Sequence, residues 1–237
     1  MTFRSRTYEF KVWGRYALFT DPVTKIGGEK CSYHIPTYEA LKGVAKSIYW
    51  KPTIVWVIDE VRIMKPIRTQ TKGTKPLVFS GSNTLAIYTF LADAEYQVRA
   101  HFEWNLQRSE LEHDRNAAKH SAMAERALKR GGRQDIFLGT RDCQGYVEPC
   151  EFGTGVGHYD TIDELGFGLM FHGFDYPDET GVNELHARFW YPTMKQGVIR
   201  FDAPVQCQIR KYVREMEPKQ FKLGANVSVL MDEEVEA

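Results

Sequence analysis

Apolar and polar residues alternate near the start of the chain and predict a β-strand from Thr7 to Trp13. Tyr8, Phe10 and Val12 fall on one face of this strand, and the charged residues between them fall on the other. A polar stretch from Thr20 to Tyr33 follows, and we expect it to form a loop.

The spacing then changes to that of an amphipathic helix, which begins at Pro36 and ends before Pro52. Proline suits the first turn of a helix, and the residue before a proline avoids helical angles. Tyr49 lies in the last turn, where we expect it to be half buried with its hydroxyl exposed. The apolar positions recur three or four residues apart and predict a buried stripe of Tyr38, Leu41, Val44, Ala45 and Ile48.

Further strands and a second helix complete the first part of the chain. β-branched residues predict a strand over Thr53–Ile63, and alternation predicts another over Tyr96–Leu106. The stretch between them, Met64–Thr84, contains prolines and glycines and predicts irregular structure. A helix rich in Ala, Glu, Lys and Arg is expected over Leu111–Arg130, ended by two glycines. Short strands are expected at 135–138 and 144–148.

This order of strand, helix, strand, strand, helix, strand is that of the split βαβ or ferredoxin-like fold. The RNA-recognition motif has the same order. After Cys150 the pattern changes to short strands with turns between them, at 167–174, 186–191, 198–201 and 207–213. We therefore expect an α+β protein with a ferredoxin-like (RRM-like) N-terminal domain at 1–150 and a small antiparallel β domain at 151–222. The acidic end at 223–237 is expected to be a disordered tail.

Composition indicates a soluble protein. Hydrophobic residues make up 43% of the 237 positions, which suffices for a proper core. The N-terminus has no apolar segment typical of a signal peptide, and no uncharged apolar run reaches the roughly 18 residues that span a bilayer. The four cysteines form no C-x-x-C pair, and we interpret them as reduced thiols. We expect a cytoplasmic protein with no membrane contact.

The formal net charge is zero, but the charges are unevenly placed along the chain. The segment from Val61 to Ala92 has five Lys or Arg residues and no acidic residue, and the second predicted helix with its exit is also basic. Such a patch would neutralise phosphates, and its binding would weaken with salt. A solvated helix face beside a loop is the alternative interpretation. The candidate RNA-binding residues are Arg62, Lys65, Arg68, Lys72, Arg108, Arg115, Arg126, Lys129 and Arg133.

Metal-ligand patterns are incomplete in the sequence. The pair Cys31-x-x-His34 has no second half, and Glu110, Glu112 and Asp114 suit the capping and the dipole of the second helix better. The glycines at 153–157 resemble a phosphate-binding loop only loosely, because the Lys-Ser/Thr end of a P-loop is missing. We expect no metal and no cofactor, and a surface turn at the glycines.

Cleavage of RNA without a metal is the chemistry that remains. The 2′-hydroxyl beside a phosphate is a built-in nucleophile, so an enzyme has to position it, transfer protons and stabilise charge on phosphorus. Histidine titrates near neutrality, and a tyrosine can serve if nearby cations lower its pKa of about 10. Lys119 and His120 are adjacent on the basic helix and point about 100° apart. By pattern alone, an ordinary helix histidine and a core tyrosine at position 49 are the commoner interpretations.

Several longer motifs carry a resemblance to a known family. The first are YALFTDP at 16–22, GEK at 28–30, PTYEALKG at 36–43 and IYWKPT at 48–53. The later ones are DRN at 114–116 with Lys119 and His120, DIFLG at 135–139, CQGYV at 143–147 and HGFDYP at 172–177. Together they resemble the Cas-five family of CRISPR-associated RAMP proteins, in its type I-C variant, over nearly the whole chain.

The resemblance implies a ferredoxin-like N-terminal domain, a smaller C-terminal β-sheet and an RNA-processing activity. Such proteins trim precursor CRISPR RNA at the base of each repeat hairpin and keep the product as a subunit of the surveillance complex. The catalytic tyrosine of the family matches Tyr49, and its lysine-histidine pair matches Lys119 and His120. The expected enzyme is a metal-independent endoribonuclease that leaves a 2′,3′-cyclic phosphate or 3′-phosphate and a 5′-hydroxyl.

The implied partners are the repeat hairpin and the other subunits of the surveillance complex. Contact with double-stranded DNA inside that complex is a further candidate. The alternative function is a non-catalytic RNA-binding subunit that caps the guide RNA, with cutting done elsewhere. The glycines at 153–157 are the candidate for the glycine-rich loop of RAMP proteins.

Overall fold

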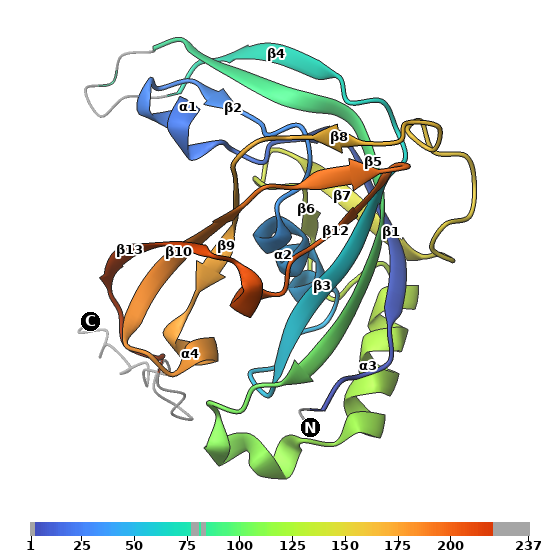
Figure 1. Cartoon of the computed structure of the whole chain (residues 1–237), viewed down its shortest axis with the longest axis vertical. Helices are drawn as coiled ribbons and strands as arrows, with labels where there is room; N and C mark the ends of the chain where they lie inside the picture. Colours follow the sequence, from blue (N-terminus) through green and yellow to red (C-terminus); the bar gives the residue numbers. More distant parts are fainter. Residues whose placement is uncertain (1–2, 77–80, 82–83, 220–237) are drawn as a thin grey trace, which may run out of the picture.

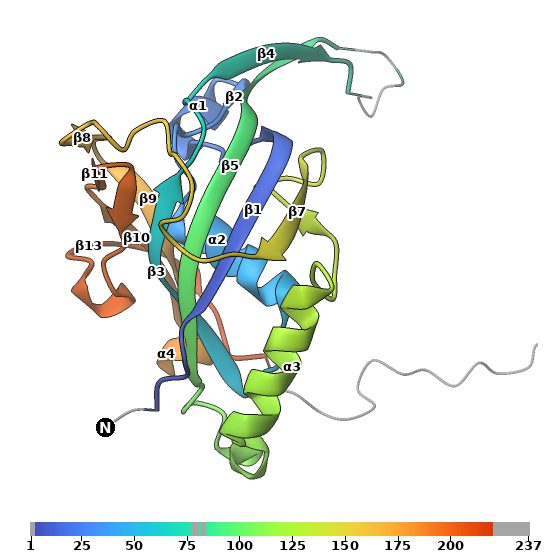
Figure 2. The same ribbon diagram turned by 90° about the vertical axis from the view of Figure 1, so that its right-hand side faces the viewer.

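The computed structural model describes residues 3–76, 81 and 84–219 and shows a mixed α/β protein with mostly antiparallel sheets (Figures 1 and 2). The expected acidic tail at 223–237 lies outside the described residues. The described helices are α1 (Pro22–Ile26), α2 (Tyr38–Ile48), α3 (Ala117–Lys129) and α4 (Pro177–Thr180), with 3-10 turns η1 (Ser109–Asp114) and η2 (Pro204–Gln206).

A ten-stranded sheet forms the main layer of the molecule. In chain order its strands are β1 (Tyr8–Ala17), β2 (Lys30–Cys31), β3 (Ile54–Ile63), β4 (Thr69–Thr74), β5 (Ala86–Trp104), β6 (Ile136–Phe137), β7 (Gln144–Pro149), β8 (Leu165–Gly166), β11 (Thr193–Lys195) and β12 (Val198–Arg200). The order across the sheet is β6-β7-β1-β5-β3-β12-β11-β8, and β2 and β4 also pair with β5. A separate three-stranded sheet has the order β13-β10-β9 and consists of β9 (Met170–Asp175), β10 (Glu184–Trp190) and β13 (Ile209–Glu215).

The long strand β5 organises the sheet. It lies between β1 and β3 and is antiparallel to both, while β7 pairs with the far side of β1. Alternation places Phe10, Val12, Val98 and Phe102 in the buried core, which also receives the apolar stripe of α2. Helix α2 contacts β3, and α3 contacts β7. The end of α2 and the first turns of α3 are thereby brought together.

The predicted strands and helices are largely confirmed, with three corrections. The expected loop over Thr20–Tyr33 contains α1 and β2, because Asp21 caps a short helix. The stretch Met64–Thr84 includes β4, which pairs with the early part of β5, so β5 begins ten residues before the predicted strand. The second helix begins at Ala117 instead of Leu111, because the chain makes a 3-10 turn and then a break at Arg115–Asn116.

The segment after Cys150 contributes to both sheets. Strands β9, β10 and β13 form the three-stranded antiparallel sheet, whereas β8, β11 and β12 extend the large sheet. Strand β12 hydrogen-bonds directly to β3, so the pairing crosses residue 150. The division into domains at 1–150 and 151–222 stays a prediction.

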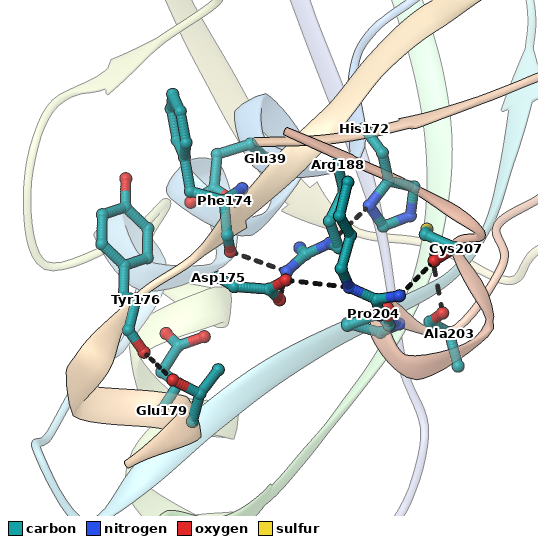
Figure 3. A network of polar contacts seen from close by, with 12 residues as sticks. Glu39, His172, Phe174, Asp175, Tyr176, Glu179, Arg188, Ala203, Pro204 and Cys207 are labelled. Carbon is teal, nitrogen blue, oxygen red and sulfur yellow. Dashed lines mark hydrogen bonds and ion pairs between the residues drawn. The ribbon is translucent and has the colours of Figure 1, made fainter. Parts of the chain in front are cut away.

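A buried polar network joins α2 to the smaller sheet (Figure 3). Arg188 on β10 donates to the carbonyl of Phe174 at 2.7 Å and pairs with the carboxylate of Asp175. Glu39 on α2 accepts from the backbone N–H of Phe174 at 3.2 Å. Burial lowers the pKa of His172 to about 3, so its neutral ring can accept a hydrogen bond from Arg188 Nε at 3.4 Å. The network holds the smaller sheet against α2.

Candidate active site

Tyr49 occupies the position that ends α2. Its backbone is extended (φ −156°, ψ 126°), its N–H donates to the Ala45 carbonyl at 3.0 Å, and its carbonyl accepts from Trp56 Nε1 at 2.6 Å. This change from helical to extended backbone turns the ring away from the helix surface and into the protein. Tyr49 is 0% exposed. The prediction that its hydroxyl would be exposed is therefore wrong.

The first turns of α3 supply the other two predicted residues. Asn116 caps the helix, since its side-chain oxygen accepts from the Lys119 N–H at 3.0 Å. His120 faces inward, is 0% exposed and lies with its ring centroid 5.5 Å from that of Trp104. Lys119 faces outward with its side chain 49% exposed. The two neighbours thus point in different directions, as their helical spacing predicts.

The phenol of Tyr49 and the imidazole of His120 are in direct contact. The Tyr49 hydroxyl lies 2.8 Å from His120 Nδ1, and His120 Nε2 lies 2.8 Å from the backbone carbonyl of Asp114. A carbonyl oxygen can only accept, so Nε2 carries a proton. In the neutral ring, Nδ1 is then unprotonated and accepts the phenol hydrogen.

Asp114 connects Lys119 to this pair. Its carboxylate lies 2.5 Å from Lys119 Nζ and 3.3 Å from His120 Nε2, and it accepts from Thr53 Oγ1 at 2.6 Å. We expected Asp114 to cap the second helix, but Asn116 has that role. The Asp114 carboxylate instead holds the lysine and the histidine together. Sequence spacing offered no sign of this, because Asp114 lies outside the helix and reaches it through a break in the chain.

Two pKa shifts describe the electrostatics of the cluster. Burial, followed by the negative charge of Asp114, raises the pKa of Tyr49 to about 12, although Arg133 opposes the rise. For Asp114, partial burial favours the neutral acid, but the hydrogen bonds from Lys119 and Thr53 prevail and lower the pKa to about 2. At neutral pH the cluster therefore holds a protonated phenol beside an ionised carboxylate. The lowering effect of Arg133 is smaller than these two effects, so the pKa of Tyr49 is not brought below its ordinary value by nearby cations.

Three of the nine candidate RNA-binding residues are engaged inside the protein. Arg62 is 6% exposed and bonds to Asp160 at 2.7 Å and to the carbonyls of Thr154 and Gly155. It holds the glycine-rich loop in place, so its guanidinium is occupied by contacts within the protein. The other two are Arg108, paired with Asp178 at 2.6 Å, and Arg115, bonded to the carbonyls of Asn105 and Arg108.

The other six lie at the surface in two groups. Lys65, Arg68 and Lys72 belong to or precede β4, and the Lys72 ammonium lies 3.3 Å from the ring centre of Tyr16. The second group is at the end of α3 and consists of Arg126, Lys129 and Arg133. Arg133 is exposed and close enough to act on the pKa of Tyr49. Arg133 thus connects this group to the candidate active site.

In the described part of the chain, no three His, Cys, Asp or Glu side chains gather as a metal site would require. All four cysteines lie within this part and are unpaired. None of the helices described here combines the length and the apolarity needed to cross a bilayer.

Comparison with known proteins decides the family. Residues 7–202 match the family model described as CRISPR-associated protein (Cas_Cas5), in its Cas5d form. The chain belongs to the Cas5 family. The resemblance to the type I-C variant is thereby confirmed.

Relatives of known name agree with the Cas5 assignment. The chain is 31% identical over 216 residues to the CRISPR pre-crRNA endoribonuclease Cas5d of Mannheimia succiniciproducens, covering 79% of this chain and 91% of that protein. It is 28% identical over 149 residues to the Thermus thermophilus protein of the same name, covering 59% and 62%. A crystal structure of a CRISPR-associated protein has a TM-score of 0.74 and 35% identity, covering 89% of this chain and 99% of that one. The Cas5 fold is thus shared across nearly the whole of the matched structure.

Proposed function

We propose that this Cas5 protein is a metal-independent endoribonuclease that cleaves precursor CRISPR RNA at the base of the repeat hairpin. It would retain the product as a subunit of the type I-C surveillance complex. The observation that carries the proposal is the 2.8 Å contact between Tyr49 and His120, with Lys119 joined to them through Asp114. The names of the two relatives support the substrate class.

The geometry supports a proton relay from the RNA to His120. The phenol oxygen of Tyr49 takes the proton of the 2′-hydroxyl as the phenol hydrogen passes to Nδ1 of His120. The resulting imidazolium donates its Nε2–H toward Asp114, whose carboxylate is ionised and stabilises the positive charge. This division of labour is similar to that of the Ser-His-Asp triad, in which a buried carboxylate orients a histidine.

Lys119 acts on the phosphate in this scheme. The 2′-oxygen attacks phosphorus, a cyclic phosphate forms, and the 5′-oxygen leaves. The exposed ammonium of Lys119 neutralises the charge that develops on the phosphate oxygens, and it is the nearest group able to give the leaving oxygen a proton. The products are an RNA with a 2′,3′-cyclic phosphate and an RNA with a 5′-hydroxyl.

The cluster is closed in this structure. Tyr49 and His120 are both 0% exposed, whereas Lys119 is half exposed. A phosphodiester therefore has to approach over Lys119, compete for its ion pair with Asp114 and uncover the phenol. The break between η1 and α3, at Arg115–Asn116, is the place where the chain can rearrange with the least loss of helical hydrogen bonds.

The same burial favours a second candidate function. A non-catalytic subunit that caps the guide RNA needs no accessible phenol, and a buried Tyr-His pair would then serve only to pack α2 against α3. The two candidates differ in one respect that is easy to measure, namely whether the purified protein shortens repeat RNA.

The ferredoxin-like N-terminal domain is part of the same proposal. The support is that α2 connects β1 to β3 while β5 lies between these strands, and that α3 connects β5 to β7 beside β1. This is a split βαβ arrangement, repeated once. The proposal also includes a cytoplasmic location, the repeat hairpin and the other complex subunits as partners, and contact with double-stranded DNA within the complex.

The test is a cleavage assay of repeat RNA in excess EDTA, beside an RNA with a single 2′-deoxy nucleotide at the cut site. We expect the first RNA to be cut to a cyclic phosphate or 3′-phosphate end, and the second to be bound but left intact. Cutting of the deoxy substrate would eliminate attack by the 2′-hydroxyl. An intact normal substrate, bound by the protein, would instead support the non-catalytic function.

A further inference from the structure

A pocket of about 400 Å³ lies beside the segment that carries Tyr49. Its wall is built from the end of α2, the start of β3, the loop after β5, α4 and residues 216–219. This volume lies within the range of small-molecule sites in proteins. The side chains that characterise it are Lys46, Trp50, Asn105, Arg108, Tyr176 and Lys219.

The pocket combines aromatic surface with positive charge. Trp50 is 49% exposed although it follows the fully buried Tyr49, and Tyr176 supplies a second ring. The pocket is lined by three cations and two carboxylates, and both carboxylates are already paired. Asp178 pairs with Arg108 at 2.6 Å. Glu179 pairs with Lys46 at 3.4 Å and also with Lys42, which is outside the pocket lining, at 2.5 Å. Arg108 and Lys46 are thus partly used by these pairs, but with Lys42 and Lys219 four cations face two carboxylates. The net positive charge favours an anionic ligand, and the rings favour a flat one.

Alternate residues of one short segment serve the pocket and the candidate active site. Tyr49 and Thr53 point to the cluster, through His120 and Asp114 respectively. Trp50, Pro52 and Ile54 line the pocket. A ligand held on Trp50 is thus only one residue away, along the chain, from the proposed relay.

A second segment makes the same connection. Asn105 and Arg108 line the pocket, and the carbonyls of both accept from Arg115 Nη2 at 3.3 and 3.2 Å. Arg115 directly follows Asp114, which holds Lys119 and His120. Movement of the segment from Asn105 to Arg115 would therefore displace residues of both the pocket and the Tyr49 cluster.

We propose that this pocket binds one unpaired nucleotide of the RNA that flanks the cleaved phosphate, with its base stacked on Trp50 and its phosphate held by Lys46 and Lys219. This assignment rests on the proposed function, because it takes the RNA at the Tyr49 cluster as the source of the nucleotide. Aromatic faces beside cations are the usual way in which proteins hold single-stranded nucleic acid. Unpaired nucleotides are available where a hairpin stem meets its single-stranded flank. The pocket would thus set which phosphate reaches Tyr49.

The test uses RNA with the fluorescent base 2-aminopurine at each unpaired position around the cut site in turn, made uncleavable by a 2′-deoxy nucleotide. At one position we expect the wild-type protein to quench the fluorescence, Trp50→Phe to retain most of the quenching and Trp50→Ala to lose it. Trp50→Ala should weaken binding about 10-fold, in line with the loss of one stacked base. An abasic nucleotide at that position should weaken wild-type binding by a similar factor and leave the binding of Trp50→Ala unchanged.

Tyr212→Ala is the matched control, because Tyr212 is 58% exposed on β13, away from this pocket, and should bind as wild type. If Trp50→Ala fails to fold, the assignment can still be tested with Trp50→Phe and Lys46→Gln. Lys46→Gln should weaken RNA binding and make that binding less dependent on salt concentration. The pocket assignment would be overturned if no position showed quenching. It would also be overturned if the abasic RNA weakened the binding of Trp50→Ala as much as that of the wild type. Because the RNA is uncleavable, this result is separate from the ribonuclease proposal, which fails only if the normal RNA stays intact.

Discussion

The phenol oxygen of Tyr49 lies 2.8 Å from Nδ1 of His120, although 71 positions separate the two residues in the chain. Tyr49 ends α2, and His120 lies in the first turns of α3. The contact exists because both helices pack on one face of the same sheet. The hydrogen bond couples the two side chains, and each of them can be removed separately to test the proposed proton relay.

Replacing Tyr49 by Phe is expected to lower the single-turnover rate of RNA cleavage by about 100-fold or more, because it removes the group that exchanges protons with the 2′-hydroxyl. The ring still fills the same space, so RNA affinity should change little. Rates and dissociation constants measured on the same RNA will separate the two effects. Tyr146→Phe, which removes the hydroxyl of a half-exposed tyrosine on β7, serves as the control. A full rate for Tyr49→Phe would remove Tyr49 from the mechanism.

Asp114→Asn should reduce both activity and stability. The folded-state pKa of Asp114 is about 2, below the reference value of 3.8, so its ionised form stabilises the protein above pH 4. A shift of this size corresponds to about 2 kcal/mol, and it is lost as the pH falls from 4 to 2. Urea unfolding at pH 7 should show the variant less stable by about this amount, with the difference shrinking toward pH 2. A pH-independent difference would mean that shape, and not charge, explains the loss.

Two arginines from the predicted RNA-binding set should behave differently. Arg133 is exposed near the cluster, so Arg133→Ala is expected to weaken RNA binding and to reduce the slope of log affinity against log salt by about one. Arg62 is buried and bonded to the 154–160 loop, so Arg62→Ala is expected to cost about 2 kcal/mol of folding stability. Salt titrations of RNA binding and urea unfolding of both variants will check this. An unchanged salt slope for Arg133→Ala would place the RNA elsewhere.

The network in Figure 3 offers a comparison of buried and exposed ion pairs. Arg188 is 2% exposed and pairs with Asp175, so Arg188→Ala should destabilise the protein by about 3 kcal/mol, because it leaves a part-buried carboxylate with Arg210 as its remaining charged partner. Arg200 also pairs with a carboxylate, that of Glu60 at 2.8 Å, but its side chain is 84% exposed. Arg200→Ala should therefore cost less than about 1 kcal/mol. Thermal or urea unfolding will measure the loss of folding stability in each variant. Equal losses in the two variants would contradict the prediction.

Much of the fold could be predicted from periodicity, since α2, β3 and β7 lie close to their predicted bounds. The start of β5 could not, because residues 86–89 pair with β4 and none of them is buried, so no core face imposes alternation there. The break before α3 was also hidden, because Leu111–Arg130 is rich in helix-forming residues throughout. Tertiary contacts that the sequence pattern does not reveal, such as the bond from Thr53 to Asp114, help to stabilise the break.

The candidate site was predictable as a set of residue types but not as a geometry. The resemblance pointed to Tyr49, Lys119 and His120, and the structure brings them together. Asp114 was misassigned, because a carboxylate just before a helix usually caps it. The burial of the phenol was also missed, because periodicity places a side chain on a face but does not report the single extended residue that turns Tyr49 inward.

The pairing of β12 with β3 has a consequence for how this chain can be divided. A fragment that stops at residue 150 would keep the pairing of β3 with β5 but would uncover the other edge of β3 over residues 60–62, where free backbone groups could recruit strands from other molecules. Such a fragment is expected to aggregate even though it holds every residue of the proposed relay. Strand β12 thus protects this edge of β3 from pairing with other molecules, and we expect expression of the isolated N-terminal part to fail through aggregation.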